Sequence, residues 1–483
     1  MKKKSMSVNA ILNALRTALG VIFPLITFPY ASRVLGVDNI GRYNFAYSVV
    51  NYGALFAALG IYTYAVRECA KVRDNRQKLD KMASEIFSIN LLSTVVAYTA
   101  LFILCVAVPK FSVNRLLIYI LSLEIIFTTI GCEWVYSVFE DYLYITLRTL
   151  GVYIISMVLL FTFIHTEQDL VKYSIVSVIS VCGANVANII GRKKYCNIRL
   201  TFRLNLKQHI LPIMTIFMNT VTTTIYVNSD VLILGLMTNN TYVGLYSVAV
   251  RIYTIIKRIL AAVITVSIPR LSNYWSNNEK ENLDKTCHSI FNALLIFVAP
   301  AMIGLFSMSK QVVLLISGNE FEQSYASLAI LSIALLFSLF SWFFTSCILI
   351  PSKNETKVLQ GTVVAALVNI IFNIILIPFF QERAAAFTTC MAEFIALGFG
   401  YVRSRKILKI KLNIRDITSI VVGCLAIFII CFVTNSYTGN RTVMSLLIAI
   451  PTSVLSYGII LIALKNKYAI TMLRSIIKKI EKR

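Results

Sequence analysis

The chain has 483 residues, of which 58% are hydrophobic and only 14% are charged, and its mean hydropathy is +0.76. Soluble globular domains carry about 25% charged residues. This composition excludes an ordinary soluble domain as the body of the chain. It predicts an all-α membrane protein that crosses the bilayer many times.

Apolar runs separated by charge clusters predict about 14 membrane helices, each with the roughly 20 apolar residues that a span requires. The first run follows the basic start MKKK, but it is too long for a signal peptide and lacks a small-residue cleavage site, so we expect a retained span. The predicted helices lie near 9–34, 40–66, 85–108, 115–138, 142–164, 170–190, 209–234, 241–268, 287–308, 323–350, 357–380, 383–402, 417–437 and 442–464.

The basic residues are concentrated in loops on one side of the predicted bundle. Segments 67–81, 192–207 and 403–415 and the tail 465–483 all fall on the same side when the N-terminus lies inside. Cytoplasmic loops are enriched in Lys and Arg, so both termini are expected in the cytoplasm. The net charge of +24 is spread over loops that meet anionic lipid headgroups. It is not gathered on one soluble face, as nucleic-acid binding requires.

Two segments resemble each other. LGVDNIGRYNFAYSVV (35–50) and LGLMTNNTYVGLYSVAV (234–250) both begin with Leu-Gly and continue to Gly-x-Tyr. They follow predicted helices that run in the same direction, which favours two parallel six-helix repeats with the transport path between them. Chance similarity between apolar segments stays open. The expected organisation is a first lobe at 1–190, a basic linker at 191–208, a second lobe at 209–402, a second linker at 403–416, helices 13 and 14 at 417–464 and a basic tail at 465–483.

Five cations lie within predicted spans, where each costs about 2.5–3.5 kcal/mol near the bilayer centre on insertion scales. They are Arg16, Arg148, Arg251, Lys257 and Arg258. One interpretation is that they reach the headgroups or pair with acids. The other is that they face a water-filled cavity that binds an anion, because the planar guanidinium group binds phosphate oxygens in pairs.

Acidic and polar residues accompany the cations. The intramembrane acids are expected either to neutralise the cations or to couple transport to H⁺ or Na⁺; they are Glu124, Glu133, Asp230 and Glu393. Three polar residues at helical spacing in the predicted seventh helix, Asn219, Thr223 and Tyr226, suit sugar hydroxyls, although such residues also join helices. Asn13, on the same face of the first predicted helix as Arg16, is also expected to face the glycan. Three isolated histidines and scattered cysteines show no metal-ligand spacing, so no metal site is predicted.

The segment NALRTALGVIFPLITFPYASRVLGVDNIGRYNFAYSVVNYGALFAALGIYTYAVRE (13–68) closely resembles the start of bacterial polysaccharide repeat-unit flippases. These form the polysaccharide transport branch of the multidrug/oligosaccharidyl-lipid/polysaccharide exporter superfamily. SDVLILG (229–235) and GLYSVAVRI (244–252) resemble the second repeat of that family.

The resemblance implies a transporter without an enzymatic activity or a cofactor. Its substrate would be an undecaprenyl-pyrophosphate-linked oligosaccharide, moved by alternating access from the inner to the outer leaflet of the bacterial cytoplasmic membrane for O-antigen or capsule synthesis. The family's arginine-rich cavity maps onto the five cations named above. A polysaccharide polymerase and a chain-length regulator are the protein partners that this role allows.

Three other functions stay open. A cation-coupled drug exporter of the superfamily predicts 12 helices and fewer buried arginines, whereas a peptidoglycan-precursor (lipid II) flippase shares the 14 helices and the cationic cavity. A membrane glycan polymerase or glycosyltransferase would need a long outer loop, but the longest predicted outer segment covers only residues 309–322.

Overall fold

The computed structural model describes residues 6–471 except 203, 409, 411, 412 and 440, together with residue 474. Within these residues the chain is helical, without any strand, as predicted. Ten of the described helices are long and apolar enough to cross a membrane, so the chain is a multi-pass membrane protein. It forms two compact units, Met1–Gly244 and Leu245–Arg483, which are described separately.

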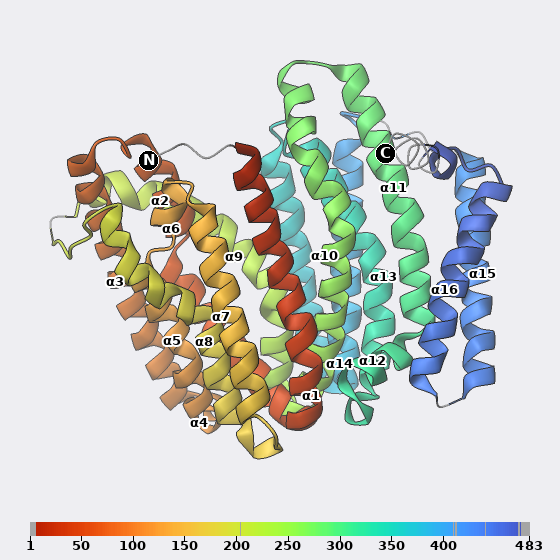
Figure 1. Ribbon diagram of the computed structural model, residues 1–483, viewed down its shortest axis with the longest axis horizontal. Helices are drawn as coiled ribbons and strands as arrows, with labels where there is room; N and C mark the ends of the chain where they lie inside the picture. The colour runs from red at the N-terminus through yellow and green to blue at the C-terminus, as the bar shows by residue number, and fades with distance from the viewer. Residues whose placement is uncertain are drawn as a thin grey trace. The chain divides into compact units, whose positions relative to one another are not determined.

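The first unit is a bundle in which α1 packs against α3, α5 and α7, while α8 packs against α5 and α7. The short helices α2 and α6 lie at the upper end of this unit in Figure 1, and α4 lies at the lower end. Its helices are α1 (Met6–Ala58), α2 (Ile61–Lys71), α3 (Arg76–Ala107), α4 (Pro109–Val113), α5 (Arg115–Gly131), α6 (Trp134–Val138), α7 (Tyr142–Phe163), α8 (Leu170–Gly191) and α9 (Leu206–Met237), with the short turns η1 (Glu167–Asp169) and η2 (Arg192–Lys194).

Helix α1 contains two helical parts that meet at Gly36. Its 53 residues would measure about 80 Å as one straight helix, more than twice the roughly 30 Å of membrane hydrocarbon. Gly36 has φ 75° and ψ 171°, a conformation that glycine adopts readily and other residues rarely do. Pro24 and Pro29 both lie inside the first helical part. The interruption therefore occurs at the glycine, between the predicted first and second spans.

The second unit packs α13 against α14 and α11, and α15 against α16 and α11. Helix α14 also contains two parts, which meet at Gln381 with φ 46° and ψ −123°. That residue separates the predicted spans 357–380 and 383–402. The elements are α10 (Asn240–Ser276, which begins in the first unit), α11 (Lys280–Ser307), α12 (Ser309–Ser317), η3 (Asn319–Phe321), α13 (Ser324–Phe343), the π-helix η4 (Phe344–Leu349), α14 (Glu355–Ser404), α15 (Ile414–Thr438) and α16 (Thr442–Ala463).

The tyrosines of the two Gly-x-Tyr segments make equivalent contacts, one in each unit. The hydroxyl of Tyr43 lies 2.5 Å from Ser177 Oγ on α8. The hydroxyl of Tyr246 lies 3.1 Å from Thr389 Oγ1 on the second part of α14. These partners fall in the predicted sixth and twelfth helices, which are equivalent positions in the two proposed repeats. The recurring contact supports the interpretation that the segments are duplicated.

The glycines of the same segments allow two backbones to approach closely within the first unit. A methyl carbon at Gly41 would lie 1.8 Å from Asn240 O. We therefore expect Gly41→Ala to lower the free energy of unfolding by about 1–3 kcal/mol, as overpacking does. Thermal unfolding in detergent measures this loss. Gly20→Ala, on the same helix, is the matched control and should cause no loss, because among the described residues no atom beyond the helix's own nearby backbone lies within 4 Å of the added carbon. Equal stability of the two variants would contradict the prediction.

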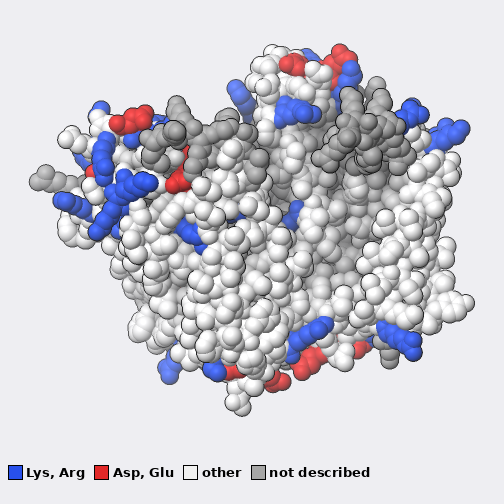
Figure 2. All heavy atoms as spheres, in the orientation of Figure 1, with Lys and Arg blue, Asp and Glu red and all other residues white. Residues whose placement is uncertain are grey.

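The basic linker that precedes α9 lies along α3. Backbone N–H groups at alternate linker residues donate to side chains that are one helical turn apart on α3. These bonds join Asn197 to Asp80 Oδ1 at 2.8 Å, Arg199 to Ser84 Oγ at 3.0 Å and Thr201 to Ser88 Oγ at 2.9 Å. Figure 2 shows Lys and Arg side chains gathered at the same end of the first unit as α2, beside a broad surface with almost no charge. That surface suits contact with lipid hydrocarbon.

Candidate functional site

Two of the predicted arginines share one carboxylate in the first unit. Arg16 on α1 places Nη2 2.5 Å from Oε1 of Glu133, the residue that immediately precedes α6. Arg148 on α7 places Nη2 3.0 Å from Oε2 of the same carboxylate. Residues 117 and 15 positions from Glu133 in the sequence are thus brought together by the packing of α1 against α7. The cluster contains two cations and one anion.

Arg148 is held in place from three sides. Its Nη1 donates to the carbonyl of Ala184 on α8 at 2.8 Å. Its guanidinium carbon lies 5.6 Å from the ring centre of Tyr136 and 5.8 Å from that of Tyr144, and the two rings stack on each other. Both tyrosine hydroxyls donate to backbone carbonyls of α8, at 3.0 Å each. The side chain is therefore fixed by contacts that do not involve its carboxylate partner.

Arg148 is also buried without full use of its donors. Its side chain is 5% exposed, against 32% for Arg16 and 22% for Glu133. Among the described residues, its buried Nε and Nη2 have no hydrogen-bond partner, because the contact from Nη2 to Glu133 is close but poorly aligned. Buried guanidinium groups normally have their donors satisfied. This arrangement leaves donors available to a second anion, and two guanidinium groups suit phosphate oxygens.

A third predicted cation is paired in the second unit. Lys257 Nζ on α10 lies 3.0 Å from Oε1 of Glu393, whose side chain is 8% exposed. The same Nζ lies 3.3 Å from the Tyr253 hydroxyl and 5.4 Å from the centre of its ring. This pair contains one cation and one anion, so its charges balance, whereas the arginine cluster has one positive charge in excess.

The remaining predicted residues are distributed over both units. Arg251 and Arg258 on α10 are exposed, as is Asn13 on α1. Glu124 on α5 is partly buried and Asp230 on α9 is buried. Helix α9 also carries Asn219, Thr223 and Tyr226, whose side chains lie outside the described residues. Their predicted role in glycan binding therefore stays a prediction.

A buried polar network that the sequence did not reveal joins α2, α3 and α9. His209 is fully buried, with Nδ1 2.7 Å from the Tyr64 hydroxyl and Nε2 2.9 Å from Oε2 of Glu85. The sequence did not indicate this network, because its three residues are far apart in the chain and no regular spacing links the histidine to the other two. The network fixes the start of α9 against α2 and α3.

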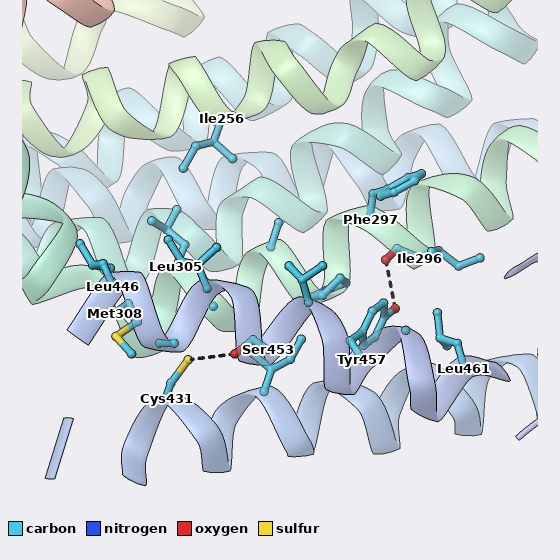
Figure 3. Close-up of a pocket in the computed structure, with 18 of the residues that line it drawn as sticks. Ile256, Ile296, Phe297, Leu305, Met308, Cys431, Leu446, Ser453, Tyr457 and Leu461 are labelled. Atoms are coloured by element: carbon cyan, nitrogen blue, oxygen red, sulfur yellow. Dashed lines mark hydrogen bonds between the residues drawn. The ribbon is translucent and has the colours of Figure 1, made fainter. Parts of the chain in front are cut away.

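The second unit contains an apolar cavity of about 670 Å³. Side chains from α11, α12, α15 and α16 line it, together with Ile256 of α10 (Figure 3). The Tyr457 hydroxyl donates to Ile296 O at 3.0 Å, and Cys431 Sγ lies 3.9 Å from Ser453 Oγ. The polar groups of the lining are thus already paired, so the cavity suits hydrocarbon and not phosphate.

Comparisons with known proteins place this geometry in context. Residues 7–275, more than half of the chain, match the family model described as "Polysaccharide biosynthesis protein". The chain is 24% identical to the "Putative O-antigen transporter" of Escherichia coli (strain K12), over 84% of the chain and 99% of that protein. It is 23% identical to "Capsular polysaccharide biosynthesis protein CapF" of Staphylococcus aureus, over 74% of the chain and 89% of that protein.

Among solved structures, the chain is similar to the lipid II flippase MurJ in an inward closed conformation. The TM-score is 0.73 at 18% identity, over 94% of this chain and 99% of that one. At this identity the likeness shows a shared fold.

Proposed function

We propose that this chain, which belongs to the polysaccharide biosynthesis protein family, is a flippase for lipid-linked glycans. Its substrate is an undecaprenyl-pyrophosphate-linked oligosaccharide repeat unit. The chain moves this unit from the inner to the outer leaflet of the bacterial cytoplasmic membrane by alternating access, for O-antigen or capsule synthesis. It is a transporter and not an enzyme, in line with the names of its relatives.

The observation that carries the proposal is the cluster of Arg16, Glu133 and Arg148. Charged side chains inside a membrane bundle are costly and mark substrate pathways. A structural ion pair would have balanced charge, but among the described residues this cluster has one cation in excess and buried donors without hydrogen-bond partners. A pyrophosphate group supplies the missing negative charge and several acceptor oxygens. The glycan would occupy polar surroundings, and the prenyl tail would stay in lipid.

We also propose 14 spans arranged as two six-helix repeats and two further helices. The ten long apolar helices become 14 when α1 and α14 are each divided at their interruptions and α5 and α9 are included. The equivalent contacts of Tyr43 and Tyr246 support the repeat. Both termini then lie in the cytoplasm, in accord with the basic loops.

Coupling to H⁺ or Na⁺ is proposed for the acids that lie apart from the arginine cluster, Glu124 and Asp230 above all. Arg251, Lys257 and Arg258 are proposed as further cationic contacts along the transport path. A polysaccharide polymerase and a chain-length regulator would act on the product after release, so they are the partners that this function calls for.

Reconstitution tests the function directly. The purified chain in proteoliposomes should move a fluorescent prenyl-pyrophosphate oligosaccharide, detected as probe that becomes accessible to a lectin on the opposite side. The same vesicles should leave a cationic dye in place, whereas a drug exporter would move the dye. Movement of lipid II but not of repeat units would favour the peptidoglycan-precursor function, and lipid movement equal to that of empty vesicles would refute the proposal.

A further inference from the structure

The carboxylate of Glu133 occupies an unusual position between two guanidinium groups. Arg–carboxylate pairs are commonly bidentate, with two parallel bonds from one guanidinium group. Here each oxygen of Glu133 faces a different arginine, Oε1 facing Arg16 and Oε2 facing Arg148. Neither arginine is therefore saturated by this anion. The carboxylate sits where the two guanidinium groups converge, which is where a phosphate would bind.

Resting on the proposed function, we propose that Glu133 is an exchangeable counter-ion. Without substrate, its carboxylate occupies the anion site of Arg16 and Arg148. When the pyrophosphate arrives, it displaces the carboxylate, and when the pyrophosphate leaves, the carboxylate returns. Glu133 thereby sets the affinity of the site for pyrophosphate and favours release of the lipid.

The charges explain why such a group is needed. Arg148 is almost fully buried, and a buried cation without a counter-ion is strongly unfavourable. An empty site therefore requires an anion of its own. That same anion repels a dianionic pyrophosphate, so its presence keeps binding reversible. A site with both arginines and no carboxylate would retain its substrate.

The contacts identify the carboxylate as the group that moves. Arg148 is anchored to Ala184 O and to two tyrosine rings, contacts that do not depend on Glu133. The carboxylate of Glu133, in contrast, forms ion pairs only with the two guanidinium groups among the described residues, and beyond them it interacts electrostatically with Tyr153. It also belongs to no continuous helix, since α5 ends at Gly131 and Cys132 adopts a left-handed conformation with φ 47°. Its side chain is 22% exposed, which leaves room for rotation.

Binding of geranyl pyrophosphate to the purified full-length protein in detergent tests the inference, with calorimetry as the measurement. We expect Glu133→Gln, which keeps the shape of the side chain but removes its charge, to bind the probe at least five-fold more tightly than the unsubstituted protein. The same variant should export less glycan in cells, because release slows. If Glu133 had only a structural role, its substitution would instead weaken binding of the probe.

Glu140→Gln is the matched control. It makes the same change of charge in the same unit, at a glutamate that also pairs with an arginine, but the partner is Arg73 and the glutamate is 58% exposed. The affinity of this control variant for geranyl pyrophosphate should stay within two-fold of that of the unsubstituted protein. If Glu133→Gln shows no cooperative thermal unfolding, Glu133→Asp decides in its place, because the shorter side chain cannot face both arginines and should also raise the affinity.

The outcomes separate the inference from the function. If a folded Glu133 variant binds geranyl pyrophosphate no more tightly than the unsubstituted protein does, the proposed exchange of counter-ions is wrong. An equal gain in the Glu140 control overturns it too, because the effect would then be unspecific. If Arg16→Ala and Arg148→Ala leave probe binding unchanged, the phosphate site itself is wrong and the proposed function loses its main support.

Discussion

Arg148→Ala is expected to abolish export of the lipid-linked glycan. The substitution removes one side of the proposed contact between Arg148 and the pyrophosphate. Truncating one member of a buried charge pair of this kind costs about 2–5 kcal/mol, which corresponds to a loss of affinity for the substrate of roughly 30-fold or more. The loss should be large here because this guanidinium group is the most buried and the best anchored of the cluster. Surface glycan in a strain that lacks its own flippase, normalised to the amount of protein in the membrane, measures the effect.

Two further variants test whether the loss of export is specific to the guanidinium group of Arg148. Arg148→Lys keeps the charge but loses the planar group that donates to Ala184 while facing Glu133, so its export should be intermediate. Arg73→Ala removes another arginine of the first unit that pairs with a glutamate, but that glutamate, Glu140, is 58% exposed, so this variant should export normally. Normal export by Arg148→Ala, or equal loss in the Arg73 variant, would show that the cluster does not bind substrate.

His209→Leu is expected to destabilise the first unit by about 3–5 kcal/mol. The substitution leaves the carboxylate of Glu85 and the hydroxyl of Tyr64 buried without their partner, and a buried carboxylate that loses its partner has this cost. Unfolding in detergent measures the change. The double variant Glu85→Leu/His209→Leu should recover most of the loss, because two apolar side chains in place of a buried pair are close to neutral.

His288→Leu provides the control for this network. That histidine also faces an acid, Asp284 at 3.5 Å, but the aspartate is 55% exposed and the pair lies near the surface. Exposed pairs contribute about 0–1 kcal/mol. A single His209 variant that is as stable as the His288 variant, or a double variant that is no better than the single one, would contradict the assignment.

Much of the architecture follows from the sequence, because span length and charge distribution are local properties. The helical class and the multi-pass character are confirmed by the structure and by the solved flippase with the same fold. The family predicted from segment 13–68 is confirmed by the match over residues 7–275. The breaks at Gly36 and Gln381 fall between predicted spans. The predicted lobe boundaries stay predictions.

The pairing of side chains did not follow from the sequence. Arg16, Arg148 and Glu133 were each identified as intramembrane charges, but their meeting depends on how α1 packs against α7, which periodicity does not encode. The contact of Tyr136 with Arg148 was not predicted, because an aromatic residue in an apolar segment usually belongs to the core. Its stacking on Tyr144, eight positions further along the chain, also depends on tertiary packing. The binding roles of the predicted cations likewise stay predictions.

The hydroxyl contacts of Tyr43 and Tyr246 have a consequence for the history of the chain. If both halves descend from one gene, a half-length ancestor already contained this contact between a tyrosine and an alcohol side chain. After fusion, one copy kept serine and the other threonine, Ser177 and Thr389. Because each bond stays inside its own unit, the proposed rearrangement of the lobes during transport would break neither bond.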